Sequence, residues 1–132
     1  PRQLGRIVVD FMQLVEPPKR REHREREVAD ISASLKAMAK ETGLPVLALS
    51  QLKRATEDRK GPPRLSDLRE SGSIEQDADI VAFLHRTGNP DEGNPAVKLI
   101  IEKQRNGPTG DVDLIFMRET TRFEVAAPTE GP

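Results

Sequence analysis

The sequence predicts an α/β fold in which parallel strands are followed by an antiparallel hairpin. A strand-like apolar run, an amphipathic helix and a second apolar run follow one another within residues 6–50, which is typical of a right-handed βαβ unit. Further along, a Gly-Pro-Thr-Gly turn at 107–110 separates two strand-like runs, as in a hairpin. The strand-like runs cover residues 6–10, 45–50, 79–84, 97–103, 112–117 and 121–125.

One helix is predicted over residues 25–42, between the first two strands. Apolar residues recur there at steps of three and four, which places them in one stripe with charged residues on the opposite face. Gly43 is expected to end the helix, and Pro45 prevents its continuation into the next strand. The stripe comprises Val28, Ile31, Leu35 and Met38.

Length and composition limit what this protein can be. With 132 residues, of which 35% are hydrophobic, the chain can build one core. Its net charge is −1 although 33% of the residues are charged, so contacts with a polyanion must come from local patches. The absence of cysteine excludes disulfides and thiolate metal sites. No apolar run approaches the ~18 residues of a membrane span, so a cytoplasmic protein without membrane contact is expected.

Two polar residues follow predicted strands. Asp10 closes the first strand, and in open α/β sheets ligands bind beyond the carboxyl ends of strands. A single carboxylate there can hold Mg²⁺ through water. Gln51 follows the second strand, and its amide can donate to a terminal phosphate. Taken alone, Asp10 is more often a turn former or a helix cap, and Gln51 an ordinary surface residue.

The predicted hairpin carries two cations, Lys103 and Arg105, near its turn. Phosphoryl transfer is accelerated mainly by positive charge placed against the leaving γ-phosphate. A basic hairpin turn of this kind can therefore take part in phosphoryl transfer, although a generic one is more often an exposed turn that keeps the protein soluble.

The segment from Asp67 to Asp79 is unusually long and polar for a connection, and it leads into an apolar strand. Asp67, followed three residues later by Glu70, predicts a capping box that opens a short helix. The first amides of that helix, together with Arg69, predict a site for an anion such as phosphate. The alternative is a capped helix with an ordinary surface arginine.

These motifs together resemble the C-terminal motor domain of the DnaB-type replicative helicases. The resemblance covers nearly all of residues 6–125 and rests on the run from Arg6 to Leu14, on the 67–79 segment and on the Lys-Gln-Arg-Asn-Gly run at 103–107. It implies the C-terminal half of a RecA-like P-loop ATPase fold. Residues 1–125 are then a partial motor domain, and residues 126–132 a disordered tail.

The resemblance also implies cofactors and roles for individual residues. ATP and Mg²⁺ are the expected cofactors, with Asp10 on the metal through water and Gln51 as the phosphate sensor. Lys103 and Arg105 are expected to reach into the ATP site of the neighbouring subunit. The residues expected to hold the phosphates of single-stranded DNA are Arg69, Glu70 and Gly72. A basic run at Lys19, Arg20 and Arg21 matches the family's first central-channel loop in position but not in letters.

The implied protein is a replicative DNA helicase of the primosome. It is expected to form a ring-shaped homohexamer, to couple ATP hydrolysis at subunit interfaces to 5′→3′ movement on single-stranded DNA and to duplex unwinding, and to work with primase and a helicase loader. The family's GxxxxGK[ST] loop and catalytic glutamate lie upstream of Asp10, and no GxxxxGK[ST] occurs here, so this chain alone is expected not to hydrolyse ATP.

Two alternatives remain open. One is another RecA-like ATPase of recombination or repair, which should lack the 67–79 segment. The other is a non-catalytic, truncated remnant that acts only as a DNA-binding or subunit-interaction module.

Aromatic residues are scarce. The chain has no Trp and no Tyr, and its four Phe residues are expected to lie in the core. Proteins that bind single strands by stacking bases need exposed aromatic rings. Binding through charge and backbone amides is therefore expected, and such binding is tolerant of sequence and sensitive to salt.

Overall fold

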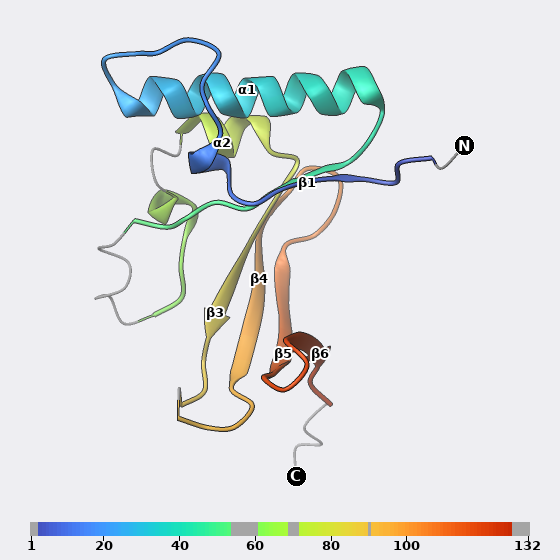
Figure 1. Cartoon of the computed structure of the whole chain (residues 1–132). Coiled ribbons are helices and arrows are strands. Elements are labelled where there is room, and N and C mark those ends of the chain that lie inside the picture. The colour runs from blue at the N-terminus through green and yellow to red at the C-terminus, as the bar shows by residue number, and fades with distance from the viewer. Residues whose placement is uncertain (1–2, 54–60, 69–71, 90, 128–132) are drawn as a thin grey trace. The chain divides into compact units, whose positions relative to one another are not determined.

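A computed structural model describes residues 3–53, 61–68, 72–89 and 91–127 (Figure 1). The described residues fall into two compact units that divide between Ala78 and Asp79. The first unit contains a parallel strand pair with helices, and the second an antiparallel sheet. The predicted α/β class is therefore confirmed.

The first unit is built on a strand–helix–strand sequence. β1 (Ile7–Val9), α1 (Arg24–Thr42) and β2 (Val46–Ala48) follow one another, and β1 pairs with β2 in parallel. Both strands are shorter than the predicted runs, but the pairing continues beyond them: Leu49 N–H donates to the Val9 carbonyl and Met12 N–H to the Leu49 carbonyl, each at 2.9 Å.

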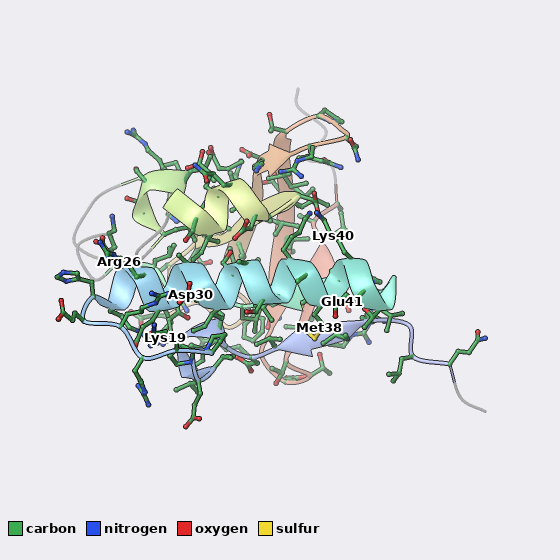
Figure 2. The ribbon with its side chains drawn as sticks, turned by 90° about the horizontal axis from the view of Figure 1, so that it is seen from above. Lys19, Arg26, Asp30, Met38, Lys40 and Glu41 are labelled. Atoms are coloured by element: carbon green, nitrogen blue, oxygen red, sulfur yellow. The ribbon has the colours of Figure 1, made fainter. Side chains whose placement is uncertain are left out.

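Helix α1 agrees with its predicted boundaries. Val28 and Ile31 are each 1% exposed and form the centre of the core of this unit, so the predicted stripe is the buried face. Gly43 has a φ of 66°, and its N–H donates to the Ala39 carbonyl at 3.0 Å, which ends the helix in the left-handed conformation that glycine adopts without strain. Lys40 in the last turn, labelled in Figure 2, complements the negative end of the helix dipole.

The predicted capping box at Asp67 is wrong. Asp67 closes a 3-10 turn, η3 (Leu65–Asp67), and its carboxylate accepts the Arg64 N–H at 2.7 Å. Glu70, the second residue of the predicted capping box, lies outside the described residues. Leu68, the next residue after Asp67, is 4% exposed and has a ψ of 129°, which lies outside the helical region, so no helix begins directly after Asp67. The next helix within the described residues is α2 (Gly72–Asp77).

The second unit is an antiparallel sheet. Its strands are β3 (Ile80–Arg86), β4 (Ala96–Gln104), β5 (Gly110–Met117) and β6 (Arg122–Val125), hydrogen-bonded in that order. The predicted hairpin at 107–110 joins β4 to β5. The antiparallel part is larger than one hairpin because residues 87–95 between β3 and β4 are too few for a parallel crossover, which needs a dozen or more.

The aromatic residues do not all lie in the core. Phe83 is 5% exposed, but Phe123 on β6 is 45% exposed and packs against Phe116 with ring centroids 5.0 Å apart. The expectation that all four Phe residues lie in the core is wrong for Phe123, because β6 has a neighbouring strand on one side only. Pairing also continues past β6, where Ala126 N–H donates to the Asp113 carbonyl at 2.9 Å. Ala126 is therefore hydrogen-bonded to the sheet although it falls in the predicted tail, whose residues 128–132 lie outside the described residues.

Candidate functional site

Two predicted site residues lie at one edge of the parallel strand pair. β1 and β2 run in the same direction and pair Val9 with Ala48 at their ends, so the residues that follow both strands emerge together. Asp10 follows β1 directly, and Gln51 comes three residues after Ala48; both are exposed. The structure brings Asp10 and Gln51 to the edge where the sequence predicted them, and their chemical roles remain predictions.

Gln13 holds this edge together, although sequence reasoning did not identify it as a site residue. It is half-buried in a 3-10 turn, η1 (Met12–Leu14). Its Nε2 donates to Ser50 Oγ at 2.9 Å, and its Oε1 accepts the Gln51 N–H at 3.3 Å. The only signal in the sequence is a polar residue inside an otherwise apolar run after Asp10.

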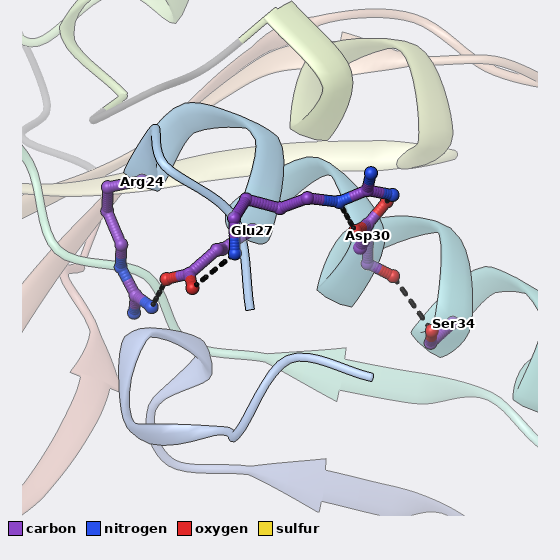
Figure 3. Close-up of polar contacts among 5 residues, drawn as sticks. Arg24, Glu27, Asp30 and Ser34 are labelled. Carbon is purple, nitrogen blue, oxygen red and sulfur yellow. Dashed lines mark hydrogen bonds and ion pairs between the residues drawn. The ribbon is translucent and has the colours of Figure 1, made fainter. Parts of the chain in front are cut away.

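A cluster of ion pairs anchors the segment that precedes α1 (Figure 3). Arg24 Nη2 donates to the Gln13 carbonyl at 2.6 Å, and Arg24 Nη1 lies 2.9 Å from Glu27 Oε2. The other Glu27 oxygen accepts the Arg21 N–H at 3.1 Å. Arg21 Nε lies 2.9 Å from Asp30 Oδ2. Arg21, predicted as part of a basic loop, is therefore tied to α1.

The centre of this cluster is the carboxylate of Glu27, whose side chain is 8% exposed. The hydrogen bond from Arg24, followed by that from the Arg21 backbone, holds the pKa of Glu27 below its ordinary value, so the carboxylate is ionised at neutral pH. Lys19, labelled in Figure 2, lies in the same segment as Arg20, and both residues are exposed. The cluster thus fixes the end of a segment that presents positive charge to solvent.

The two cations of the β4–β5 hairpin have different surroundings. Lys103 lies within β4 opposite Val81 and is half-buried. Arg105 lies in the turn and is exposed, with its Nη1 3.0 Å from Asp79 Oδ1 and its N–H donating to the Asp79 carbonyl at 2.8 Å. Of the two cations, Arg105 is the better placed to reach a neighbouring molecule.

The residues predicted to hold DNA phosphates are only partly described. Arg69 and Glu70 lie outside the described residues. Gly72 is the exposed first residue of α2, and a Cβ built on it would meet no atom within 4 Å. Gly72 also does not have a positive φ, unlike the described glycines Gly43, Gly61 and Gly110. Neither space nor conformation within the described residues requires glycine at this position.

Lys53, which lies beyond β2, is bonded to residues that precede Leu68 in the chain. Its Nζ donates to the Ser66 carbonyl and its N–H to the Asp67 carbonyl, both at 3.0 Å. Leu52 and Leu68 form an isolated antiparallel bridge beside these bonds. These contacts hold residues 52–53 beside residues 66–68.

The part of the chain that the structure describes contains no group of three or more His, Asp or Glu residues arranged to hold a metal ion. None of its helices is long and apolar enough to cross a membrane.

Comparison with known proteins relates this geometry to a family. The family model of the DnaB-like helicase C-terminal domain matches residues 1–125. The chain belongs to this family. The resemblance that the motifs indicated is therefore confirmed.

The helicase domain is similar to several curated proteins. It is 54% identical over 125 residues to the replicative DNA helicase DnaB of Geobacillus stearothermophilus and 50% identical over 125 residues to the replicative DNA helicase DnaC of Bacillus subtilis. Each match covers 91% of this chain but only 28% of the relative. The chain thus spans little more than a quarter of the length of these relatives.

Solved structures show the same correspondence. The helicase domain matches a solved ATPase domain with a TM-score of 0.82 and 44% identity over 92% of this chain and 45% of that one. It matches a DnaB-like replicative helicase, solved for its interactions with primase, with a TM-score of 0.79 and 44% identity over 89% of this chain and 30% of that one. The predicted RecA-like ATPase fold, present in part, is therefore confirmed.

Proposed function

We propose that the full-length protein containing this helicase domain is a replicative DNA helicase. It couples ATP hydrolysis at subunit interfaces to 5′→3′ translocation on single-stranded DNA and to duplex unwinding. The observation that carries the proposal is the placement of Asp10 and Gln51 at one edge of the parallel strands in a chain that belongs to the helicase family. Ligands of open α/β sheets bind at such an edge.

Asp10 is proposed to hold Mg²⁺ through water. A magnesium ion keeps most of its waters and takes one or two carboxylates together with substrate phosphates. An exposed strand-end carboxylate with no further acidic cluster among the described residues fits that requirement. When bound, the ion supplies positive charge to the phosphates of ATP. Gln51 lies at the same edge and donates its side-chain amide to the terminal phosphate.

Arg105 is proposed to act on the ATP of a neighbouring subunit, so the protein is a homohexameric ring in which each active site needs two chains. Its support is the exposed position in the β4–β5 turn, where the guanidinium pairs with the equally exposed Asp79. An arginine supplied in trans to a transferring phosphoryl group contributes ~10³–10⁵ in rate. Lys103 is proposed to assist from within β4.

Single-stranded DNA is proposed to bind through Arg69, Glu70 and Gly72. The support is that no described neighbour requires glycine at position 72, so close approach of a phosphate to the backbone is a reason for its presence. Binding of this kind follows the backbone and is independent of base sequence. Primase and a helicase loader are proposed as partners, and a similar solved helicase is described with primase.

A subunit-mixing experiment tests the proposed site. Full-length Gln51→Ala and Arg105→Ala proteins should each be nearly inactive in ATP hydrolysis. Mixed in equal amounts and allowed to exchange, they should regain activity, because an interface that takes its glutamine from one variant and its arginine from the other is intact. In a ring whose interfaces are identical, random mixing gives about a quarter of the interfaces both an intact glutamine and an intact arginine.

Two outcomes would contradict the proposal. Absence of recovery after demonstrated subunit exchange would show that Arg105 does not act in trans. Absence of hydrolysis by the wild-type full-length protein, with nucleotide, magnesium and DNA present, would favour the non-catalytic alternative. A mixture of Gln51→Ala with an Arg122→Ala protein is the control. Arg122 is an exposed arginine of β6 in the same sheet, so the Arg122→Ala protein should already hydrolyse ATP before mixing.

A further inference from the structure

A continuous series of contacts connects the strand-end edge to the segment of residues 17–23. Gln13 lies at one end of the series, bound to both Ser50 and Gln51. Because a backbone N–H can only donate, the side-chain oxygen of Gln13 must face Gln51, and its nitrogen must then face Ser50. The orientation of this amide is therefore fixed by its partners.

Arg24 lies at the other end of the series. One of its nitrogens donates to the Gln13 carbonyl at 2.6 Å, and another lies 2.9 Å from Glu27, which in turn accepts the Arg21 N–H at 3.1 Å. The guanidinium is planar and rigid, so a shift of the Gln13 backbone displaces both of its contacts together. Figure 3 shows Arg24 and Glu27 side by side at the start of α1.

The contacts in this series differ in strength. The bond from Gln51 N–H to Gln13 is 3.3 Å long, the longest of the series, whereas the Arg24 bonds are 2.6 and 2.9 Å and join charged or strongly accepting groups. Charge-assisted bonds are roughly twice as strong as neutral ones, and a bond lengthened beyond 3.2 Å is weak. Gln13, Arg24 and Glu27 are therefore held together more tightly than Gln13 is held to Gln51, and the bond from Gln51 is the contact through which a movement of Gln51 reaches this group.

We propose that Gln13 and Arg24 are positioning residues that transmit the position of Gln51 to the 17–23 segment. Exposed Lys19 and Arg20 of that segment contact the phosphates of single-stranded DNA. The inference rests on the proposed function, in which Gln51 senses the terminal phosphate of ATP. Its consequence is that the nucleotide state changes the affinity for DNA through side chains that touch neither ligand.

The test uses the full-length protein and measures its dissociation constant for an oligonucleotide of random sequence, once with ADP and once with a non-hydrolysable ATP analogue. In the wild type the two constants should differ. Gln13→Ala and Arg24→Ala should each reduce the ratio of the larger to the smaller dissociation constant by about fivefold or more, since coupling between sites is commonly worth at least that factor. Arg26→Ala is the matched control because Arg26 is exposed on the same helix (Figure 2).

Thermal unfolding and ring assembly must be measured for each variant. Arg24→Gln, which keeps a side-chain donor but no charge, replaces Arg24→Ala if the latter does not fold, and a reduced ratio is again expected. A ratio that stays at the wild-type value in Gln13→Ala and in the folded Arg24 variant overturns this inference alone. A wild-type protein whose DNA affinity is the same in both nucleotide states overturns the proposed function as well.

Discussion

The carboxylate of Asp79 lies 3.0 Å from the Arg105 guanidinium, and the Asp79 carbonyl accepts the Arg105 N–H at 2.8 Å. One contact from the side chain and one from the main chain set the direction in which the arginine leaves the β4–β5 turn. The two side chains are 56% and 47% exposed, so the ion pair contributes about 0–1 kcal/mol. A pair of that strength can be exchanged for a contact with another anion at little cost in free energy.

Arg105→Ala in the full-length protein should abolish ATP hydrolysis and leave nucleotide binding nearly intact. An arginine that acts on the transferring phosphoryl group contributes ~10³–10⁵ in rate and little to ground-state affinity. Steady-state hydrolysis and titration with a fluorescent nucleotide measure the two quantities separately. Arg122→Ala serves as the control, and unchanged turnover in Arg105→Ala would refute the assignment.

Asp79→Asn should lower kcat far less than Arg105→Ala does. The substitution keeps the size of the side chain and an oxygen acceptor but removes the charge, and an exposed pair of about 0–1 kcal/mol corresponds to at most about a fivefold change. The measurement is kcat at saturating ATP. A rise in kcat would instead show that Asp79 restrains Arg105, and a loss as large as that of Arg105→Ala would contradict a purely orienting contact.

Gly72→Ala should weaken binding of single-stranded DNA while leaving thermal stability unchanged or slightly increased. No atom of the described residues lies within 4 Å of the added methyl group, and alanine is up to ~1 kcal/mol more favourable than glycine in a helix. Dissociation constants on a homopolymer and on a random sequence should rise by similar factors, and those of Arg69→Ala should behave in the same way. Gly5→Ala is the matched control, since a Cβ there also meets no atom within 4 Å. A loss that depends on the bases would argue against contact with phosphates.

Glu27→Gln should change how thermal stability depends on pH. The hydrogen bond from Arg24, and then that from the Arg21 backbone, lower the pKa of Glu27 in the folded protein. The contribution of a carboxylate with a lowered pKa is fully present above its unfolded value of about 4.3 and is lost as the pH falls through the folded value. The unfolding midpoint of the wild type should therefore exceed that of Glu27→Gln at neutral pH, and the difference should shrink in acid. A difference that is constant with pH would contradict the assigned cause.

Ile31→Ala should destabilise the first unit strongly. Ile31 is 1% exposed, and removing so much of a buried side chain typically costs about 2–5 kcal/mol through lost burial and the cavity left behind. The unfolding midpoint of the full-length protein measures the effect. Ile80→Ala provides the comparison, because Ile80 is 58% exposed and its substitution should shift the midpoint little.

Much of the local structure was predictable because it depends on residues close together in the chain. The spacing of Val28 and Ile31 identifies the buried face of α1, and Gly43 supplies the left-handed residue that ends it. The Gly-Pro-Thr-Gly turn likewise joins two strands in register. Periodicity and turn residues express such preferences over a few positions, so a single sequence is enough to recognise them.

The candidate site could be predicted from the sequence only in part. Asp10 and Gln51 could be assigned to one edge because parallel strands end on the same side of a sheet. The contact of Gln13 with Gln51 joins residues 38 positions apart, and no local pattern marks it. The helix start predicted at Asp67 was wrong, since the sequence motif does not reveal that the following residue, Leu68, is buried and extended.

The sequence by itself determined where the helix and strands lie, which family the motifs resemble, and which charged residues follow the strands. The tertiary structure decided which polar groups meet: Gln13 with Gln51, Arg24 with Glu27, and Arg105 with Asp79. The physical reason is that backbone preference and amphipathicity act along the chain. Hydrogen bonds and ion pairs between distant residues form only after packing has fixed the path of the backbone that carries them.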